Sequence, residues 1–316
     1  MIEVQNNMEG YDKQFETVFK EIRKVVVGQD EMLEGLMIGL LSDGNVLLEG
    51  YPGLAKTLAI KSFSEAMDLV FSRIQNTPDL MPSDITGTHI IQETSGKRQF
   101  KFQPGPIFAN IVLADEINRA TPKTQSALLE AMQEKQVTVS GETFALDLPF
   151  FVLATQNPIE QEGTYPLPEA QADRFLLKIV LGYPSPKEEL EIVTKFTEES
   201  KLPKIRKVVS KNEIQKFQSQ AEKVPVSEEI KKKAVKLVAL TRMSKHLAYG
   251  ASPRASIALI KTSKARALIR GRKYVSTEDL VAMARPVLRH RIILNFEAER
   301  QGLTADSIID ELVKSV

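Results

Sequence analysis

The amino-acid sequence predicts an α/β domain followed by a helical domain, with the boundary between residues 185 and 186. Before this boundary, short apolar runs alternate with stretches of helical spacing, which is typical of a parallel sheet covered on both faces. After it, the sequence shows helical spacing alone. Pro184 and Pro186 make a stiff connector where the pattern changes.

The predicted elements follow from these patterns in chain order. Buried strands are expected at 45–49, 69–74, 111–114, 150–154 and 175–181. Helices are expected at 12–23, 30–41, 57–67 and 123–134. Two alternating stretches, 88–103 around Ser95-Gly96 and 136–147 around Ser140-Gly141, predict β-hairpins inserted into the core, although edge strands fit the alternation equally well. In the second domain, helices are expected at 187–196, 210–221, 227–244, 252–270, 277–284 and 304–313.

Composition limits the class of protein. The 316 residues, 42% hydrophobic and 26% charged, describe a globular protein, and the lack of cysteine excludes disulfides and cysteine metal sites. Without a secretion signal or an apolar stretch long enough to span a bilayer, a cytoplasmic protein is expected. His89, His246 and His290 show no metal-ligand spacing.

Charge is distributed unevenly along the chain. Residues 186–316 carry 27 Lys+Arg against 16 Asp+Glu, whereas residues 1–185 carry 15 against 25. A basic half can indicate nucleic-acid binding. It can also mean that the two halves attract each other, within a chain or between subunits, or simply that helix faces are solvated.

A glycine-rich loop follows the first predicted strand and precedes a helix. In the stretch LLEGYPGLAKTLAI, the residues Gly50, Lys56 and Thr57 match the phosphate-loop pattern G-x-x-x-x-G-K-[ST]. Such a loop turns backbone N–H groups toward phosphate and adds the positive end of the next helix. Lys56 is expected to reach the outer phosphates, and the Thr57 hydroxyl is expected to ligate Mg²⁺.

Ala55 stands where that pattern has glycine. Glycine is required where φ is positive or where a Cβ would clash. We therefore expect Ala55 to have a negative φ, to begin the helix, and to turn its methyl group into the core. Replacement by glycine would then be slightly destabilising.

Two further strand ends carry polar groups. The run IVLAD ends in Asp115, which is followed by Glu116, and these carboxylates suit Mg²⁺ binding and polarisation of an attacking water. Asn157 follows a third strand, where its amide would orient the same water, although Asn-Pro is also a common turn signal.

These motifs together resemble those of the AAA+ ATPases and, more narrowly, of the MoxR family within the helix-2-insert clade. The matching stretches are GYPGLAKT, NTPDLMPSDITG, ADEINRA, EAMQEKQVTVSG, ATQNP, EGTYPLPEAQADRF and GASPRAS, between about residues 26 and 295. Alanine at position 55 is usual in that family. The resemblance implies an AAA+ P-loop core with a five-stranded parallel sheet, two inserted hairpins and a C-terminal all-α lid domain.

The resemblance also implies roles for individual residues. Asn157 resembles the sensor-1 residue, Arg174 the arginine finger that enters a neighbouring subunit's site, and Arg254 the sensor-2 arginine. Arg119 is a rival for the finger. The nucleotide-binding residues would be Val26, Val27, Gly28 and Gln29 beside adenine, and Gly50, Pro52, Gly53, Leu54, Ala55, Lys56, Thr57 and Leu58 in the loop, with Thr57 and Asp115 at Mg²⁺.

The function implied by the resemblance is ATP hydrolysis in a homo-oligomer, commonly a hexameric ring, with a chaperone-like role and a partner carrying a von Willebrand factor A domain. A nucleic-acid motor is an alternative, but 6% aromatic residues and no tryptophan argue against base stacking. A magnesium-chelatase-type subunit is another alternative. A nucleotide-gated scaffold is a third, against which Glu116 and Arg174 speak, since binding alone needs neither.

Overall fold

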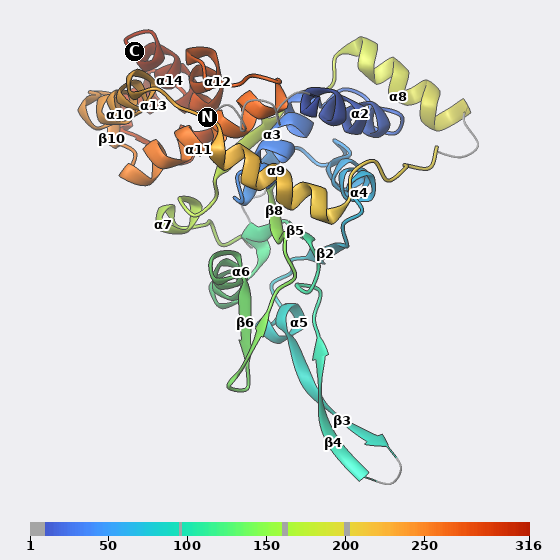
Figure 1. Ribbon diagram of the computed structural model, residues 1–316. Coiled ribbons are helices and arrows are strands. Elements are labelled where there is room, and N and C mark those ends of the chain that lie inside the picture. The colour runs from blue at the N-terminus through green and yellow to red at the C-terminus, as the bar shows by residue number, and fades with distance from the viewer. Residues whose placement is uncertain (1–9, 95–96, 160–163, 199–202) are drawn as a thin grey trace.

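A five-stranded parallel sheet forms the centre of the first domain, as predicted (Figure 1). The structure is a computed structural model that describes residues 10–94, 97–159, 164–198 and 203–316. The strands are β1 (Val46–Gly50), β2 (Phe71–Gln75), β5 (Ile111–Asp115), β8 (Phe151–Gln156) and β9 (Leu177–Leu181), in the order β2-β5-β8-β1-β9. Because all are parallel, the carboxyl ends of β1, β5 and β8 meet at one edge of the sheet.

Alternate residues of these strands serve two apolar cores. On one face, Leu48 and Leu113 belong to a cluster that includes helices α2 (Tyr11–Arg23), α3 (Asp30–Leu41) and α4 (Lys56–Ala66). On the other face, Leu47 and Val112 belong to a second cluster with α6 (Pro122–Glu134), α5 (Pro82–Thr86) and the 3-10 helix η1 (Ile117–Arg119). Burial on both faces explains why the strands read as continuous apolar runs.

Both predicted hairpins are present. Strands β3 (Gly87–Thr94) and β4 (Lys97–Pro104) pair antiparallel and project from the body of the domain (Figure 1). The expected turn at Ser95-Gly96 lies outside the described residues. The second hairpin joins β6 (Gln136–Val139) to β7 (Glu142–Ala145), with Ser140 and Gly141 both at positive φ in its turn.

The chain after residue 185 is mainly helical, as predicted. Its helices are α8 (Pro186–Glu198), α9 (Lys211–Lys223), α10 (Glu228–Met243), α11 (Pro253–Ile269), α12 (Thr277–Leu288), α13 (Phe296–Arg300) and α14 (Ala305–Val313). The prediction omitted one small sheet, in which β10 (Leu247–Tyr249) pairs antiparallel with β11 (Ile293–Leu294). These strands are too short to show a period in the sequence. In the described part of the chain, no helix has both the length and the apolar character needed to cross a membrane.

The two parts of the chain share a core and several ion pairs. The first apolar cluster runs from α3 into α9, α11 and α12, so packing alone does not mark a boundary, and the division at residue 185 stays a prediction. Glu34 of α3 accepts hydrogen bonds from Arg270 of α11, at 2.6 and 3.2 Å. Lys211 pairs with Asp147 in the same way across the two parts. Attraction between the acidic and basic halves is therefore present within one chain.

Candidate functional site

A cavity of about 420 Å³ opens at the sheet edge where β1, β5 and β8 end. It brings together the sequence-predicted loop, both carboxylates and the predicted amide. Its lining residues are Pro52, Gly53, Leu54, Ala55, Lys56, Thr57, Leu58, Arg73, Asp115, Glu116, Thr155 and Asn157. Arg73 and Thr155 are the two members of this set that the sequence did not indicate.

The loop between β1 and α4 has glycines at two points that require them. A Cβ on Gly50 would lie 2.8 Å from the Cβ of Leu181, which is its partner on β9. Gly53 has φ 82°, in the left-handed region that favours glycine. The loop then enters α4, an 11-residue helix whose N-terminal N–H groups carry partial positive charge. The cavity therefore has a wall suited to phosphate.

The expectation for Ala55 is wrong. The residue has φ 54° and ψ 23°, a left-handed conformation, and the helix begins one residue later at Lys56. Ala55 is exposed and lines the cavity, so its methyl group is not turned into the core. The backbone of a phosphate loop alternates between conformations to turn its N–H groups inward. At this position that requirement prevails over the helix preference of alanine, at a cost of about 1–2 kcal/mol.

Asp115 and Glu116 are fixed by a hydroxyl from the neighbouring strand. Thr155, buried on β8, donates to Asp115 Oδ1 at 2.6 Å and accepts from the backbone N–H of Glu116 at 2.8 Å. Glu116 itself has φ 55° and ψ 53°. A left-handed glutamate is strained, and such strain concentrates at functional sites. One threonine thus holds the Asp115 carboxylate and the Glu116 backbone.

Arg73 is the cation that the sequence analysis missed. On β2, its guanidinium donates to Asp115 Oδ2 from Nη2 at 2.6 Å and from Nε at 3.1 Å. Parallel pairing of β2 with β5 sets Gln75 opposite Asp115 and Arg73 opposite Leu113, two residues earlier, and the long Arg73 side chain reaches Asp115 from there. With Thr155 on one oxygen and Arg73 on the other, both carboxylate oxygens of Asp115 have partners.

Glu116 has two side-chain partners of its own. Its Oε2 accepts from Gln75 Nε2 and from Arg119 Nη1, each at 3.1 Å. Arg119, the rival for the arginine finger, therefore lies beside the glutamate of its own chain. Asn157 lines the cavity and also accepts from the N–H of Ile159 at 3.2 Å, so the turn and the cavity position occur together.

Lys56 is held against the loop by hydrogen bonds from its side chain to backbone carbonyls of the loop. Its ammonium donates to the carbonyls of Gly50, at 2.6 Å, and Tyr51, at 3.1 Å. Burial lowers the pKa of Lys56, and the nearby carboxylates of Asp115 and Glu116 oppose that shift. A phosphate anion entering the cavity would supply the partner that a half-buried ammonium favours.

The oxygen donors in the cavity fit Mg²⁺. Thr57 and Asp115 line it together and offer a hydroxyl and a carboxylate. In the described residues there is no cluster of three or more His, Cys, Asp or Glu that could hold a metal by itself. Mg²⁺ is commonly bound by one or two protein side chains together with substrate phosphates, and the oxygens of Thr57 and Asp115 fit this mode of binding.

Two predicted arginines lie away from the cavity. Arg174 is exposed and donates to Gln133 of α6. Arg254, at the start of α11, pairs with Asp173 at 3.1 Å. Asp173 also accepts from the buried Arg291 at 2.8 Å. Arg254 thus pairs with the residue that precedes Arg174 in the chain, and neither predicted arginine lines the chain's own cavity.

The segment predicted to contact adenine is also separate from the cavity lining. Val26 is buried, and Gly28 and Gln29 have positive φ of 66° and 63°. A Cβ on Gly28 would lie 2.8 Å from Glu188 Oε1, so the segment lies against the beginning of α8. Contact of Val26, Val27, Gly28 and Gln29 with a base stays a prediction.

The backbone at Ala55 generates the first prediction. Ala55→Gly relieves the left-handed strain but increases the freedom of the unfolded chain, so the free energy of unfolding should be unchanged or higher by up to about 1 kcal/mol. Denaturant unfolding measures this. The control is Ala59→Gly in the buried interior of α4, which should cost at least about 1 kcal/mol. Equal losses of unfolding free energy in the two variants would contradict a left-handed backbone at Ala55.

The Arg73–Asp115 pair generates the second. Arg73→Gln should lower stability by about 0.5–1 kcal/mol without Mg²⁺, since the arginine is partly exposed. With Mg²⁺ and ADP the loss should shrink, because the metal replaces the missing positive charge beside Asp115. Thermal unfolding of both proteins in both buffers measures the difference. Arg98→Gln, on the exposed hairpin, is the control, and its stability change should not depend on Mg²⁺ and ADP. A loss of stability in Arg73→Gln that is the same with and without Mg²⁺ would contradict a metal site at Asp115.

Comparison with known proteins agrees with this geometry. The profile of the ATPase family associated with various cellular activities (AAA) matches residues 45–177, and that of the AAA lid domain matches residues 239–312. The chain is 45% identical to Chaperone MoxR1 of Mycobacterium tuberculosis, covering 94% of this chain and 80% of that protein. It is 44% identical to YeaC of Bacillus subtilis, covering 94% and 92%.

A solved structure agrees as well. The chain superimposes on the crystal structure of a candidate ATPase from Cytophaga hutchinsonii with a TM-score of 0.92 and 46% identity, covering 98% of this chain and 96% of that one. Sequence and fold therefore agree over nearly the whole length. The chain belongs to the MoxR family of AAA+ ATPases.

Proposed function

We propose that this protein hydrolyses ATP to ADP and phosphate with Mg²⁺ at the cavity between β1, β5 and β8. The observation that carries the proposal is the convergence in one cavity of the phosphate loop, Lys56, Asp115 and Glu116. Binding alone would not need a glutamate held in a strained backbone beside the phosphate wall.

The polar residues at the cavity have separate tasks in this proposal. The loop N–H groups and Lys56 would bind the phosphates, and Thr57 and Asp115 would hold Mg²⁺, whose charge would offset that of the phosphates. Glu116 accepts a proton from the attacking water, and Asn157 orients that water. Gln75 and Arg119 keep the Glu116 carboxylate in place.

In the proposed ring, a neighbouring subunit supplies the arginine finger, which is not among the residues that line the chain's own cavity. Arg174 is exposed and outside the chain's own cavity; in the proposed ring it would enter the site of a neighbouring subunit and stabilise charge on the transferring phosphoryl group. A hexamer is the proposed state. Arg254, which starts the helix α11, would couple the same interface to the helices after residue 185 through Asp173.

The cellular task that we propose is chaperone-like remodelling or maturation of protein complexes in the cytoplasm, with a partner that carries a von Willebrand factor A domain. Its support is the family, in which one relative is named a chaperone. Binding of nucleic acid is less well supported, because many cations after residue 250 already have carboxylate partners. These are Arg254, Arg266, Arg270, Arg272, Arg285, Arg289 and Arg291.

Hydrolysis is tested by Glu116→Gln. The variant should bind ATP as the wild type does but release phosphate about 10²–10⁴-fold more slowly, because the amide accepts no proton. Lys56→Ala should instead weaken binding itself. Equilibrium nucleotide binding and phosphate release, measured on both variants, separate the two effects. Turnover at the wild-type rate in Glu116→Gln would exclude the assigned role.

The trans-acting arginine is tested by mixing variants. Arg174→Ala should keep nucleotide binding and lose turnover by about 10³-fold or more. Mixed with Glu116→Gln, it should regain part of the activity, because some interfaces then join an intact Glu116 to an intact Arg174 of the neighbour. Arg119→Ala is the matched variant: it lies beside its own Glu116, so we expect mixing not to rescue it. Rescue of Arg119→Ala, with full activity in Arg174→Ala, would assign the finger to Arg119.

A further inference from the structure

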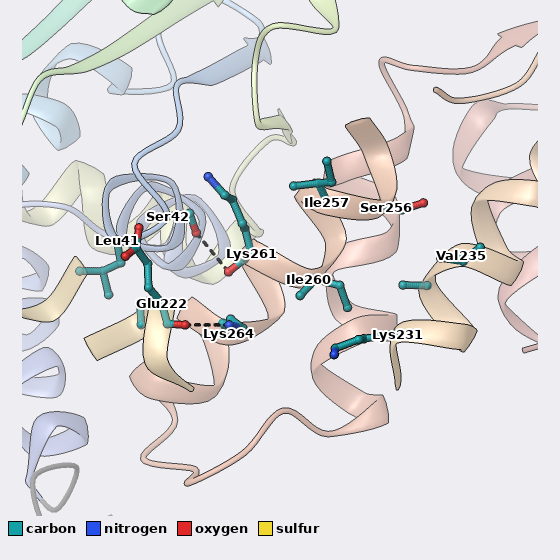
Figure 2. Close-up of a pocket in the computed structure, with 12 residues that line it drawn as sticks. Leu41, Ser42, Glu222, Lys231, Val235, Ser256, Ile257, Ile260, Lys261 and Lys264 are labelled. Carbon is teal, nitrogen blue, oxygen red and sulfur yellow. Dashed lines mark hydrogen bonds between the residues drawn. The ribbon is translucent and has the colours of Figure 1, made fainter. Parts of the chain in front are cut away.

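An apolar groove lies between the helices after residue 185, on a part of the fold that the nucleotide cavity does not use. It has a volume of about 490 Å³ and is bordered by α9, α10, α11 and the end of α3. Figure 2 shows Ile257 and Ile260 of α11 facing Val235 of α10 across it. Val235 is 58% exposed and Ile257 60% exposed. Exposed aliphatic side chains that line one groove indicate a site for a partner.

Lysines surround this groove. Lys231 of α10 and Lys261 and Lys264 of α11 border it, together with the acidic Glu222 (Figure 2). Lys231 also pairs with Glu228 at 2.6 Å. Burial lowers the pKa of Lys264, Glu222 opposes that shift, and Lys231 adds to it. In the described part of the chain, Lys261 has no carboxylate within salt-bridge distance. An apolar groove with a positive rim fits an amphipathic helix that carries acidic residues.

Helix α8 has that character. It contains four glutamates, two lysines and no buried residue. Its inner side touches the domain through Lys195, which donates to the carbonyl of Arg23 at 3.3 Å. Leu190, Val193 and Phe196, spaced three apart, are 67%, 52% and 47% exposed and form an apolar stripe. Glu189 and Glu191 beside this stripe are exposed as well.

We propose that the apolar stripe of α8 from one subunit docks into the α9–α10–α11 groove of a second copy of this chain. Leu190 and Val193 would contact Ile257 and Val235, and the α8 glutamates would face the lysine rim. This contact rests on the proposed ring and adds a specific interface to it. The helix-in-groove mode uses anchors at this kind of spacing.

The occupant is a second copy because the two surfaces lie apart within one chain. Figure 1 shows α8 at the opposite end of the molecule from α10 and α11. It contacts the end of α2 at Arg23 and the following residues at Gly28. A helix on one side and its groove on another make a head-to-tail contact, which repeats around a closed ring. The exposed Arg174 requires the same kind of arrangement.

Cysteine cross-linking tests the contact directly, because the chain has no cysteine of its own. Val193→Cys protein is mixed with Ile257→Cys protein in Mg²⁺ and ATP and treated with a short bis-maleimide. Only an intermolecular contact can then give a covalent dimer of the two variants, and we expect one. Val193→Cys mixed with Tyr274→Cys is the control, since Tyr274 is 66% exposed but does not line the groove.

Assembly measured by sedimentation decides the outcome. A chain that stays monomeric in nucleotide overturns both the ring and this contact, whereas one that assembles without the Val193–Ile257 cross-link overturns the contact alone. Val193→Asp and Ile257→Asp should each raise the concentration needed for assembly by about tenfold. A loss with Ile257→Asp but none with Val193→Asp would mean that another segment fills the groove, and would also overturn the proposal.

A charge exchange gives an independent measurement. Lys231→Glu with Lys261→Glu should weaken assembly by about tenfold, since the rim would then repel the α8 glutamates. Adding Glu189→Lys and Glu191→Lys in the same chain should restore it. Failure of this restoration, in variants whose circular dichroism and thermal unfolding match the wild type, would contradict the assigned partner.

Discussion

Parallel pairing of β5 with β8, and of β8 with β1, is the constraint on which the site depends. It brings three strand ends to one edge, so that residues more than a hundred positions apart share one cavity. Within that edge, the Thr155 hydroxyl connects the end of β8 to the carboxylate of Asp115, which ends β5, and to the backbone N–H of Glu116. The two apolar cores hold the strands in register from both faces, and the geometry of the candidate site follows from their packing.

Most of the fold could be predicted because its strands and helices follow from local patterns in the sequence. The strands are continuous apolar runs, and the helices show clear spacing, so β1, β5 and α6 were placed within one or two residues. The short pair β10–β11 was missed because two or three residues carry no period. The loop, Asp115, Glu116 and Asn157 were found for the same local reason, since each directly follows a strand.

The features that the sequence analysis missed depend on contacts between residues that lie far apart in the sequence. Arg73 reads as an ordinary polar residue of a strand until the register of β2 against β5 sets it beside Asp115. Thr155 gives no signal apart from its position two residues before Asn157. The prediction for Ala55 was wrong because its conformation follows from the inward turn of the whole loop. The helix preference of a single residue does not predict the conformation of the loop.

Asp173 has a consequence that reaches beyond one subunit. It is held by Arg291, which is anchored in the lid and also donates to the backbone around Phe175, and by Arg254 at the start of α11. The next residue in the chain is Arg174. If Arg174 serves a neighbouring site as proposed, the contacts of Asp173 would couple the two parts of one subunit to the reaction in the next.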